Sequence, residues 1–376
     1  MRNVYLNNAA GAFPLAPNVI ETATANMRNP PKVSGRDSLG GSDELWQCRR
    51  SLARLMDVSP EQVALTYNAT HGLNVAILGL SLNPGDLVIS SVMEHNSVLR
   101  PLARLEDLSR IRVEYVPLDA DMCLDVGAYD RLLLQKPRLV VLNHASNVTG
   151  RINPVAAWFA KAKSVGAITL LDASQTIGRI PVRPSELCAD MAVFSGYKGL
   201  RGPLGTGALY VAPTVSLAPV LVGGTGVKSD LRRHPEEMPM RLEAGAPNLP
   251  AIAGLGAAVM NILEGADDIT SSECTATREM YRGLASIERV RVFDASCEED
   301  RLPTISFAIG GMDAEQAGFT LSESFGIQCR SGLHCAPLIH EYLGSLPDGT
   351  VRFSASFANT SEDIEYAIDS VRRLAK

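Results

Sequence analysis

Between about residue 60 and residue 212, short runs of aliphatic and β-branched residues alternate with stretches of helical periodicity. The runs are nearly all apolar, which is typical of strands that helices cover on both faces. Strands joined through helices lie parallel in one sheet. The alternation therefore predicts an α/β fold with a mostly parallel sheet. The expected strands cover residues 63–66, 87–92, 113–117, 139–143, 167–171, 191–194 and 208–211.

The rest of the chain indicates a second, smaller domain. After Gly- and Pro-rich connections, the apolar run 249–263 predicts a long buried helix. Beyond it, expected strands at 289–293, 304–308 and 351–353 mix with helices, and the last helix begins at Thr360 with Asp363 as its capping-box partner. We expect a large domain over residues 15–250 and a smaller α+β domain over residues 251–376 that also includes residues 1–14.

Charge and hydropathy exclude several classes of function. The 35 Lys and Arg against 41 Asp and Glu give a formal charge of -6, and no basic run offers the patch that nucleic acid requires. No apolar stretch approaches the roughly 20 residues that cross a bilayer, and the start lacks a signal-peptide core, so we expect a cytoplasmic protein without membrane contact. Seven cysteines without a CxxC pair indicate reduced thiols.

Polar residues follow the expected strands directly. In an open α/β sheet, ligands bind beyond the carboxyl ends of the strands. Each polar residue alone is most simply explained as a cap, a turn residue or a satisfied interior group. Taken together they predict one site. At this site a helix N-terminus binds an anion. The same crevice is lined by an imidazole, by amides and by a carboxylate. These residues are Ala69, Thr70, His95, Asn147, Asp172 and Gln175.

A lysine follows the next expected strand, within Ser195-Gly196-Tyr197-Lys198-Gly199. In isolation Lys198 would be a solvated lysine in a glycine loop. At the shared sheet edge, burial and neighbouring charge lower the pKa of such an amine and let it form a Schiff base. A lysine, an anion site and a carboxylate for a pyridinium nitrogen together predict pyridoxal phosphate (PLP) as the cofactor.

A second reactive segment lies near the C-terminus, in Cys329-Arg330-Ser331-Gly332-Leu333-His334-Cys335. A cysteine beside a histidine in a glycine-containing loop can exist partly as thiolate, so Cys335 is the candidate nucleophile. Cys329 ends an apolar run and fits a buried role. A zinc site would need a fourth ligand and CxxC-type spacing, neither of which is present, so we expect no metal.

A series of short motifs spans nearly the whole chain in a fixed order. The chain thereby resembles the PLP-dependent cysteine desulfurases of the class V aminotransferase group, fold type I, and in particular the branch that includes selenocysteine lyases. The motifs are Tyr5-Leu6-Asn7-Asn8-Ala9-Ala10, Asn68-Ala69-Thr70, Met93-Glu94-His95-Asn96-Ser97, Ser146-Asn147, Asp172-Ala173-Ser174-Gln175, Ser195-Gly196-Tyr197-Lys198, Gly223-Gly224-Thr225-Gly226, Glu243-Ala244-Gly245, Arg330 to Cys335, and Arg352-Phe353-Ser354.

The resemblance implies a role for each candidate residue. Lys198 is the Schiff-base lysine, His95 stacks on the cofactor ring, and Asp172 contacts the pyridinium nitrogen. Gln175 and Asn147 lie near the ring hydroxyl. Thr70 and Ser195, next to Ala69 and Tyr197, hold the phosphate, which Thr225 reaches from the other subunit of a homodimer. Arg352 binds the substrate carboxylate, with Arg330, Asn147 and Ala9 nearby, and Cys335 lies on a short active-site loop.

Two positions depart from the family pattern. Asn7 stands where the family usually has Asp, and an amide keeps one acceptor while adding donors. Tyr197 stands where the family usually has His, and a phenol is neutral near pH 7, so it adds no positive charge beside a phosphate.

The expected activity is desulfuration of L-cysteine to L-alanine, with the sulfur carried on Cys335 as a persulfide for a sulfur-acceptor protein. An alternative keeps PLP but makes the enzyme a C–S or C–Se β-lyase acting on cysteine, cystine or selenocysteine, with Cys335 unnecessary. A nucleotide-binding or scaffold protein is a third hypothesis. It is disfavoured because no GxGxxG follows the first strand and no GxxxxGK[ST] occurs.

Overall fold

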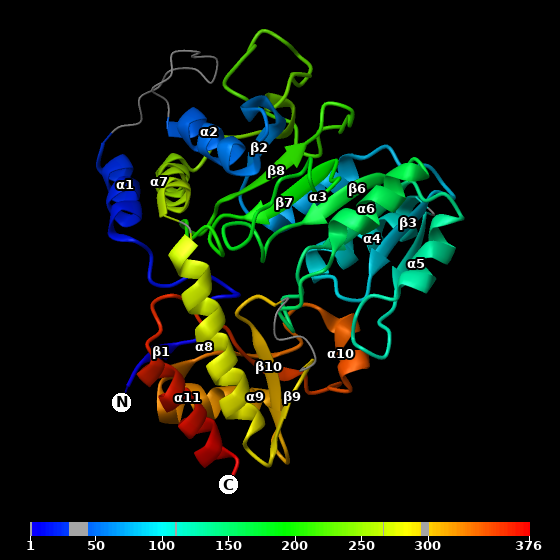
Figure 1. Ribbon diagram of the computed structural model, residues 1–376. Helices are drawn as coiled ribbons and strands as arrows, with labels where there is room; N and C mark the ends of the chain where they lie inside the picture. The colour runs from blue at the N-terminus through cyan, green and yellow to red at the C-terminus, as the bar shows by residue number, and fades with distance from the viewer. Residues whose placement is uncertain (1, 30–43, 110, 266, 295–300) are drawn as a thin grey trace.

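The computed structural model describes residues 2–29, 44–109, 111–265, 267–294 and 301–376. It has two lobes, and the larger contains a seven-stranded sheet in the order β2-β8-β7-β6-β5-β3-β4 (Figure 1). These strands are β2 (Val63–Thr66), β3 (Leu87–Ser91), β4 (Arg112–Val116), β5 (Leu139–Asn143), β6 (Ile168–Asp172), β7 (Met191–Ser195) and β8 (Gly207–Val211). The sequence placed every one of them to within a residue.

Five neighbouring strands, from β4 to β7 in the sheet order, are parallel, which confirms the predicted α/β fold. Strand β8 is the exception, because it is antiparallel to both β7 and β2. The link 196–206 between β7 and β8 contains no helix. A parallel neighbour needs a long crossover, so this short link returns the chain in the opposite direction.

Helices cover both faces of the sheet. Alternate residues of β5 enter opposite cores, with Val140 and Leu142 on one face and Leu139 and Val141 on the other. The first core also takes side chains of α2 (Glu44–Met56), α5 (Val126–Leu133), α6 (Val155–Ser164) and α7 (Leu249–Gly265). The second core takes side chains of α3 (Ala69–Gly79) and α4 (Asn96–Ser109). Helix α1 (Pro17–Arg28) packs against α7, and short 3-10 turns occur at Pro60–Gln62 and Met240–Leu242.

The smaller lobe is an antiparallel sheet packed against helices, and both termini lie in it (Figure 1). Its strands, in sheet order, are β12 (Arg330–Gly332), β13 (Thr350–Phe353), β10 (Ile305–Ile309) and β9 (Val290–Val292). Its helices are α8 (Asp267–Ala285), α9 (Ala314–Phe325), α10 (Pro337–Leu343) and α11 (Ser361–Leu374). Strand β1 (Val4–Tyr5) pairs with β11 (Ile327–Gln328). The predicted capping box is present, with Thr360 as N-cap of α11 and Asp363 as its partner.

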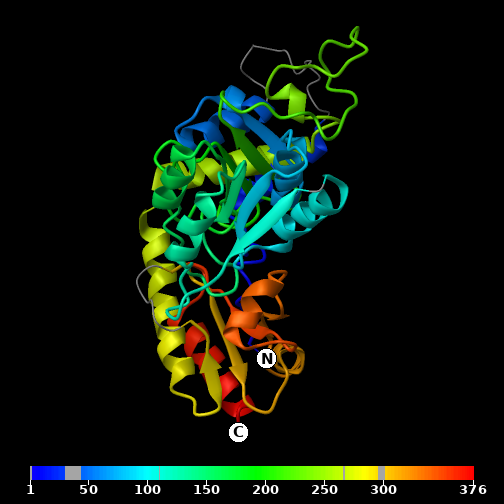
Figure 2. The same ribbon diagram turned by 90° about the vertical axis from the view of Figure 1, so that its right-hand side faces the viewer.

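The packing of two helices bears on where the lobes divide. Ile252 and Leu255 of α7 belong to the core of the large sheet, whereas Met280 and Leu284 of α8 belong to the core of the small lobe. Figure 2 shows α8 extending along the small lobe. The expected division after residue 250 stays a prediction, and this packing favours a division between α7 and α8. No helix of the described residues is long and apolar enough to cross a membrane.

Candidate active site

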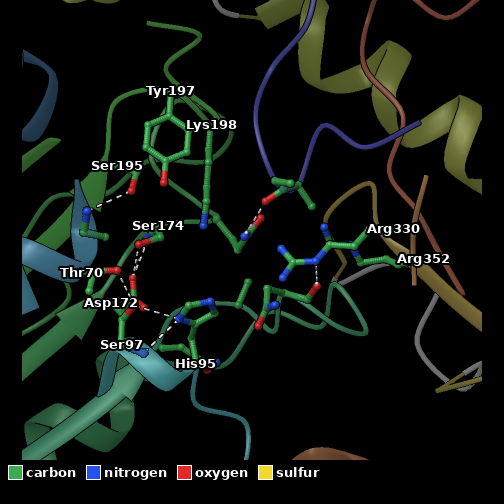
Figure 3. Close-up of a pocket in the computed structure, with 17 residues that line it drawn as sticks. Thr70, His95, Ser97, Asp172, Ser174, Ser195, Tyr197, Lys198, Arg330 and Arg352 are labelled. Carbon is green, nitrogen blue, oxygen red and sulfur yellow. Dashed lines mark hydrogen bonds between the residues drawn. The ribbon is translucent and has the colours of Figure 1, made fainter. Parts of the chain in front are cut away.

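A pocket lies where the carboxyl ends of the parallel strands face the small lobe (Figure 3). Its empty volume, with the open mouth included, is about 660 Å³. All of the site residues predicted from the sequence line it except Thr225 and Cys335. The lining consists of Ala9, Ala10, Ala69, Thr70, His95, Ser97, Asn143, Ala145, Asn147, Asp172, Ser174, Gln175, Ser195, Tyr197, Lys198, Arg330 and Arg352.

One end of the pocket is built to receive an anion. Helix α3 begins there at Ala69, whose backbone N–H donates to Ser195 Oγ at 2.9 Å. The Thr70 and Ser97 hydroxyl oxygens lie 2.7 Å apart. Amide groups at a helix N-terminus and nearby hydroxyls donate hydrogen bonds to phosphate oxygens. Tyr197 lines the same end, and its side chain is half-buried.

Lys198 and Asp172 occupy the middle of the pocket. The Lys198 side chain extends into the cavity (Figure 3), and burial lowers the pKa of its amine to about 8, against the opposing effect of the Asp172 carboxylate. Asp172 Oδ1 accepts hydrogen bonds from the Ser174 hydroxyl and, at 2.9 Å, from the Ser174 backbone N–H. An amine with this pKa has a substantial neutral fraction near pH 7.5, so it can act as a nucleophile or a base.

His95 supplies a neutral aromatic ring. Burial is the main cause that lowers its pKa to about 3, so the imidazole carries no charge at physiological pH. Its Nδ1 accepts from the Ser97 backbone N–H at 3.0 Å, which places the proton of the neutral ring on Nε2. A flat, uncharged ring fixed in this way is suited to stacking on an aromatic ligand.

Two buried amide oxygens in the lining have no partner among the described residues: Asn147 Oδ1 and Gln175 Oε1. The amide nitrogens of both side chains are fixed, since Asn147 donates to the His334 carbonyl at 2.8 Å and Gln175 to the Ala9 carbonyl at 3.1 Å. Leaving a buried acceptor unsatisfied costs about 1–3 kcal/mol. These oxygens therefore fit a ligand with hydroxyl or other donor groups.

The opposite end of the pocket carries two guanidinium groups (Figure 3). Arg352 is buried, and its Nη1 donates to the Asn147 carbonyl at 2.8 Å. Burial is the main cause that lowers its pKa to about 9, and the neighbouring Arg330 acts in the same direction. Neither arginine forms an ion pair within the part of the chain that the structure describes. This end is suited to a carboxylate.

Cys335 lies beside this cationic end, on the loop between β12 and α10. Arg330 Nη2 donates to Cys335 Sγ at 3.1 Å. The loop is tightly held: both His334 and Cys335 have left-handed backbone conformations, with φ of 50° and 59°, and the Asn96 N–H donates to the Cys335 carbonyl at 2.6 Å. Cys329, which the sequence assigns a buried role, is half-buried like Cys335, but burial of its thiol raises its pKa to about 12.

Comparisons with known proteins agree with this geometry. The model of the class V aminotransferases matches residues 4–367. A probable cysteine desulfurase of Methanothermobacter thermautotrophicus is 31% identical, over 99% of this chain and 95% of its own. The chain belongs to the class V aminotransferase family. The predicted resemblance to its cysteine desulfurase group is therefore confirmed.

Further cysteine desulfurases show the same likeness. The one from Pectobacterium atrosepticum is 31% identical over 84% of this chain and 78% of its own. Among solved structures, the apo cysteine desulfurase of Thermococcus onnurineus superposes with a TM-score of 0.90 at 28% identity, covering 99% of this chain and 94% of its own. A cysteine desulfurase from Escherichia coli gives 0.88 at 26% identity, with the same coverage.

The resemblance also implied a role for Thr225 at the phosphate of another subunit. Thr225 is buried and its hydroxyl donates to the Val227 carbonyl at 3.1 Å, away from the pocket lining. Its role therefore stays a prediction about a second subunit.

The described side chains hold no group of three or more potential metal ligands. The cysteines at 48, 123, 188, 329 and 335 form no disulfide with one another, while the side chain of residue 274 and the whole of residue 297 lie outside what the structure describes.

Five lining residues of this class V aminotransferase had no role predicted from the sequence: Ala10, Ser97, Asn143, Ala145 and Ser174. Ser97 and Ser174 orient His95 and Asp172, each from two positions further along the chain. That spacing is typical of local side-chain to backbone hydrogen bonds, so it was the signal in the sequence by which both serines could have been identified. Small residues such as Ala145 give no signal in the sequence, and only the folded structure shows that they line the pocket.

Glu94, directly before His95, provides a prediction about stability. Its Oε1 accepts from the Ser91 hydroxyl at 2.6 Å and the Asn143 N–H at 3.0 Å, and burial raises its pKa to about 8 from 4.5. Between these pH values the unfolded chain binds fewer protons, so the free energy of unfolding falls as pH rises.

We expect E94Q to remove this dependence, which reaches at most about 1.4 kcal/mol per pH unit. Urea titrations at about pH 5, 6.5 and 8 measure it, with E365Q on the exposed face of α11 as the control. Equal slopes for E94Q and wild type would contradict a protonated Glu94.

Proposed function

We propose that this chain is a PLP-dependent cysteine desulfurase that converts L-cysteine to L-alanine and takes the sulfur onto Cys335 as a persulfide. The observation that carries the proposal is the Cys335 thiol, in contact with Arg330 at the end of a pocket that also holds a half-buried lysine and a buried arginine without an ion pair among the described residues. The curated relatives and the solved structures, named as cysteine desulfurases, support it.

The pocket residues fit PLP. The first turn of α3 with Thr70 and Ser195 suits the phosphate, and Asp172 suits a protonated ring nitrogen. The unpartnered Gln175 Oε1 suits the ring hydroxyl, and Lys198 is the amine to which an aldehyde can be anchored. When bound, PLP supplies an electron sink that stabilises negative charge next to the substrate amine.

The residues of this chain then divide the reaction between them. Arg352 binds the substrate carboxylate, and Lys198, as a neutral amine, removes the proton from Cα. The Cys335 thiolate attacks the substrate Sγ, so that an S–S bond forms and the Cβ–Sγ bond breaks with its electron pair moving to Cβ. Cβ is then protonated, and the proton that Lys198 took from Cα is returned to Cα. One L-cysteine and one Cys335 thiol thereby give one L-alanine and one Cys335 persulfide.

Product analysis tests the proposal. Purified protein loaded with PLP and given L-cysteine is expected to release alanine and to carry one extra sulfur on Cys335, seen by mass spectrometry of the intact protein and its peptides. Pyruvate and ammonia without a protein persulfide would contradict desulfuration and establish the β-lyase reaction. Wild-type protein treated with an alkylating reagent before the substrate serves as the control.

We further infer a homodimer, working in the cytoplasm and passing sulfur to an acceptor protein. The segment before Thr225 is apolar yet exposed, with Val222 71% and Leu221 50% accessible in the single chain. Such a cluster next to a glycine-rich loop fits a subunit interface.

We expect V222D to shift the protein from dimer to monomer in sedimentation experiments and to weaken PLP binding. L134D, at a leucine after α5 that is 82% exposed, should leave both unchanged. Wild type that is monomeric and fully active would contradict the dimer.

A further inference from the structure

The guanidinium of Arg352 is buried without a counter-ion. Its side chain is among the largest fully buried ones, with 1% of the residue exposed. Nη1 donates to the Asn147 carbonyl at 2.8 Å, Nη2 donates to Asn7 Oδ1 at 3.2 Å, and Nε has no partner in the part of the chain that the structure describes. All of these partners are neutral, and the described residues offer Arg352 no ion pair. A buried cation without a charge partner is costly, so it binds an anion strongly.

Asn7 is the one side chain among the described residues that accepts a hydrogen bond from Arg352. Its backbone is fixed, since it forms an isolated parallel bridge with Ser354, and its carbonyl accepts from the N–H groups of Ala10 and Gly11. The segment that follows Asn7 forms part of the pocket wall through Ala9 and Ala10. Residue 7 therefore holds its side chain against the guanidinium on the pocket side of the small lobe.

We propose that the neutrality of Asn7 determines how tightly the pocket binds the carboxylate of its substrate. The amide oxygen orients the Arg352 guanidinium but does not neutralise it, so no carboxylate of the described residues competes with the substrate carboxylate for this cation. A carboxylate at position 7 would have the same size, pair with Arg352 and repel the substrate. The inference rests on the proposed function in that it takes the substrate to be an α-amino acid held by Arg352.

The other charged group at this end does not replace Arg352 in that role. Arg330 is half-buried and its Nη2 contacts Cys335 Sγ, on the side where the sulfur of the substrate is transferred. Asp172, the one carboxylate in the pocket lining, contacts Ser174 at the centre of the pocket. The charge at position 7 therefore sets how tightly Arg352 binds a carboxylate.

Two substitutions separate charge from shape. We expect N7D, which keeps size and adds one negative charge, to raise the KM for L-cysteine at least ten-fold while kcat changes less than three-fold. We expect N7L, similar in size but uncharged and without the acceptor, to change KM less than three-fold. N29D, the same chemical change at an exposed residue after α1, is the matched control and should behave as wild type.

A binding measurement keeps this inference separate from the reaction. Propionate carries a carboxylate but neither amine nor sulfur, so calorimetric titration of the PLP-loaded protein with propionate reports the Arg352 site without turnover. We expect N7D to weaken propionate binding at least ten-fold, and to have no further effect when Arg352 is already replaced by Gln.

The outcomes decide between the two claims. If wild type makes no alanine but N7D weakens propionate binding as stated, the proposed function fails and the role of Asn7 stands. If wild type makes alanine and N7D binds propionate as tightly as wild type does, the role of Asn7 is wrong. A loss of binding in N7L as large as ten-fold would also overturn it, because the amide itself would then matter rather than its lack of charge.

Discussion

Replacing Lys198 with alanine is expected to abolish turnover of L-cysteine, by roughly a thousand-fold or more, because a covalent anchor and a proton-transfer group are lost together. Lys198 is the one lysine in the pocket lining, and burial lowers the pKa of its amine to about 8. Among the residues that the structure describes, no other lysine side chain lines this pocket to take over either task.

Two measurements check the Lys198 prediction. Alanine release reports turnover, and peptide mass spectrometry after borohydride reduction reports whether the cofactor is attached at residue 198. K161A is the control, since Lys161 pairs with Asp130 on an exposed surface. K198A protein that still releases alanine at the wild-type rate would rule out the assignment of this pocket as the reaction site.

Replacing Cys335 with alanine is expected to lower alanine production from L-cysteine roughly 100-fold and to eliminate the protein persulfide, because the nucleophile for the substrate Sγ is missing. PLP binding should persist, since Asp172, Lys198 and Arg352 are unchanged. Selenocysteine and cysteine sulfinate should still react, because their leaving groups depart more readily without a nucleophile. The substitution therefore affects one step rather than the whole site.

The matched control for Cys335 is C329A. Both cysteines lie in the same segment, but Cys329 packs with the core of the small lobe and burial raises the pKa of its thiol to about 12. C329A should keep the persulfide and alanine production, at a modest cost in stability. Unchanged alanine release by C335A would instead move the enzyme to the β-lyase reaction.

The pocket lining was largely predictable because most of it follows from local order in the chain. Asn147, Asp172 and Lys198 each come a few residues after an apolar run, and parallel strands bring their carboxyl ends to one edge of a sheet. The capping box at Thr360 and Asp363 was readable for the same reason, since its two partners are three residues apart.

The sequence by itself determined the strands, the sheet edge that carries the site and the kinds of side chain there, since periodicity and strand ends are properties of short segments. The tertiary structure alone decided the reversal of β8, the packing of α7 with the large core, and the contacts of Arg352 with Asn7 and Asn147. Those contacts join residues 345 and 205 positions apart. They form only when the small lobe closes on the sheet, and no local pattern in a chain encodes which distant segments that closure brings into contact.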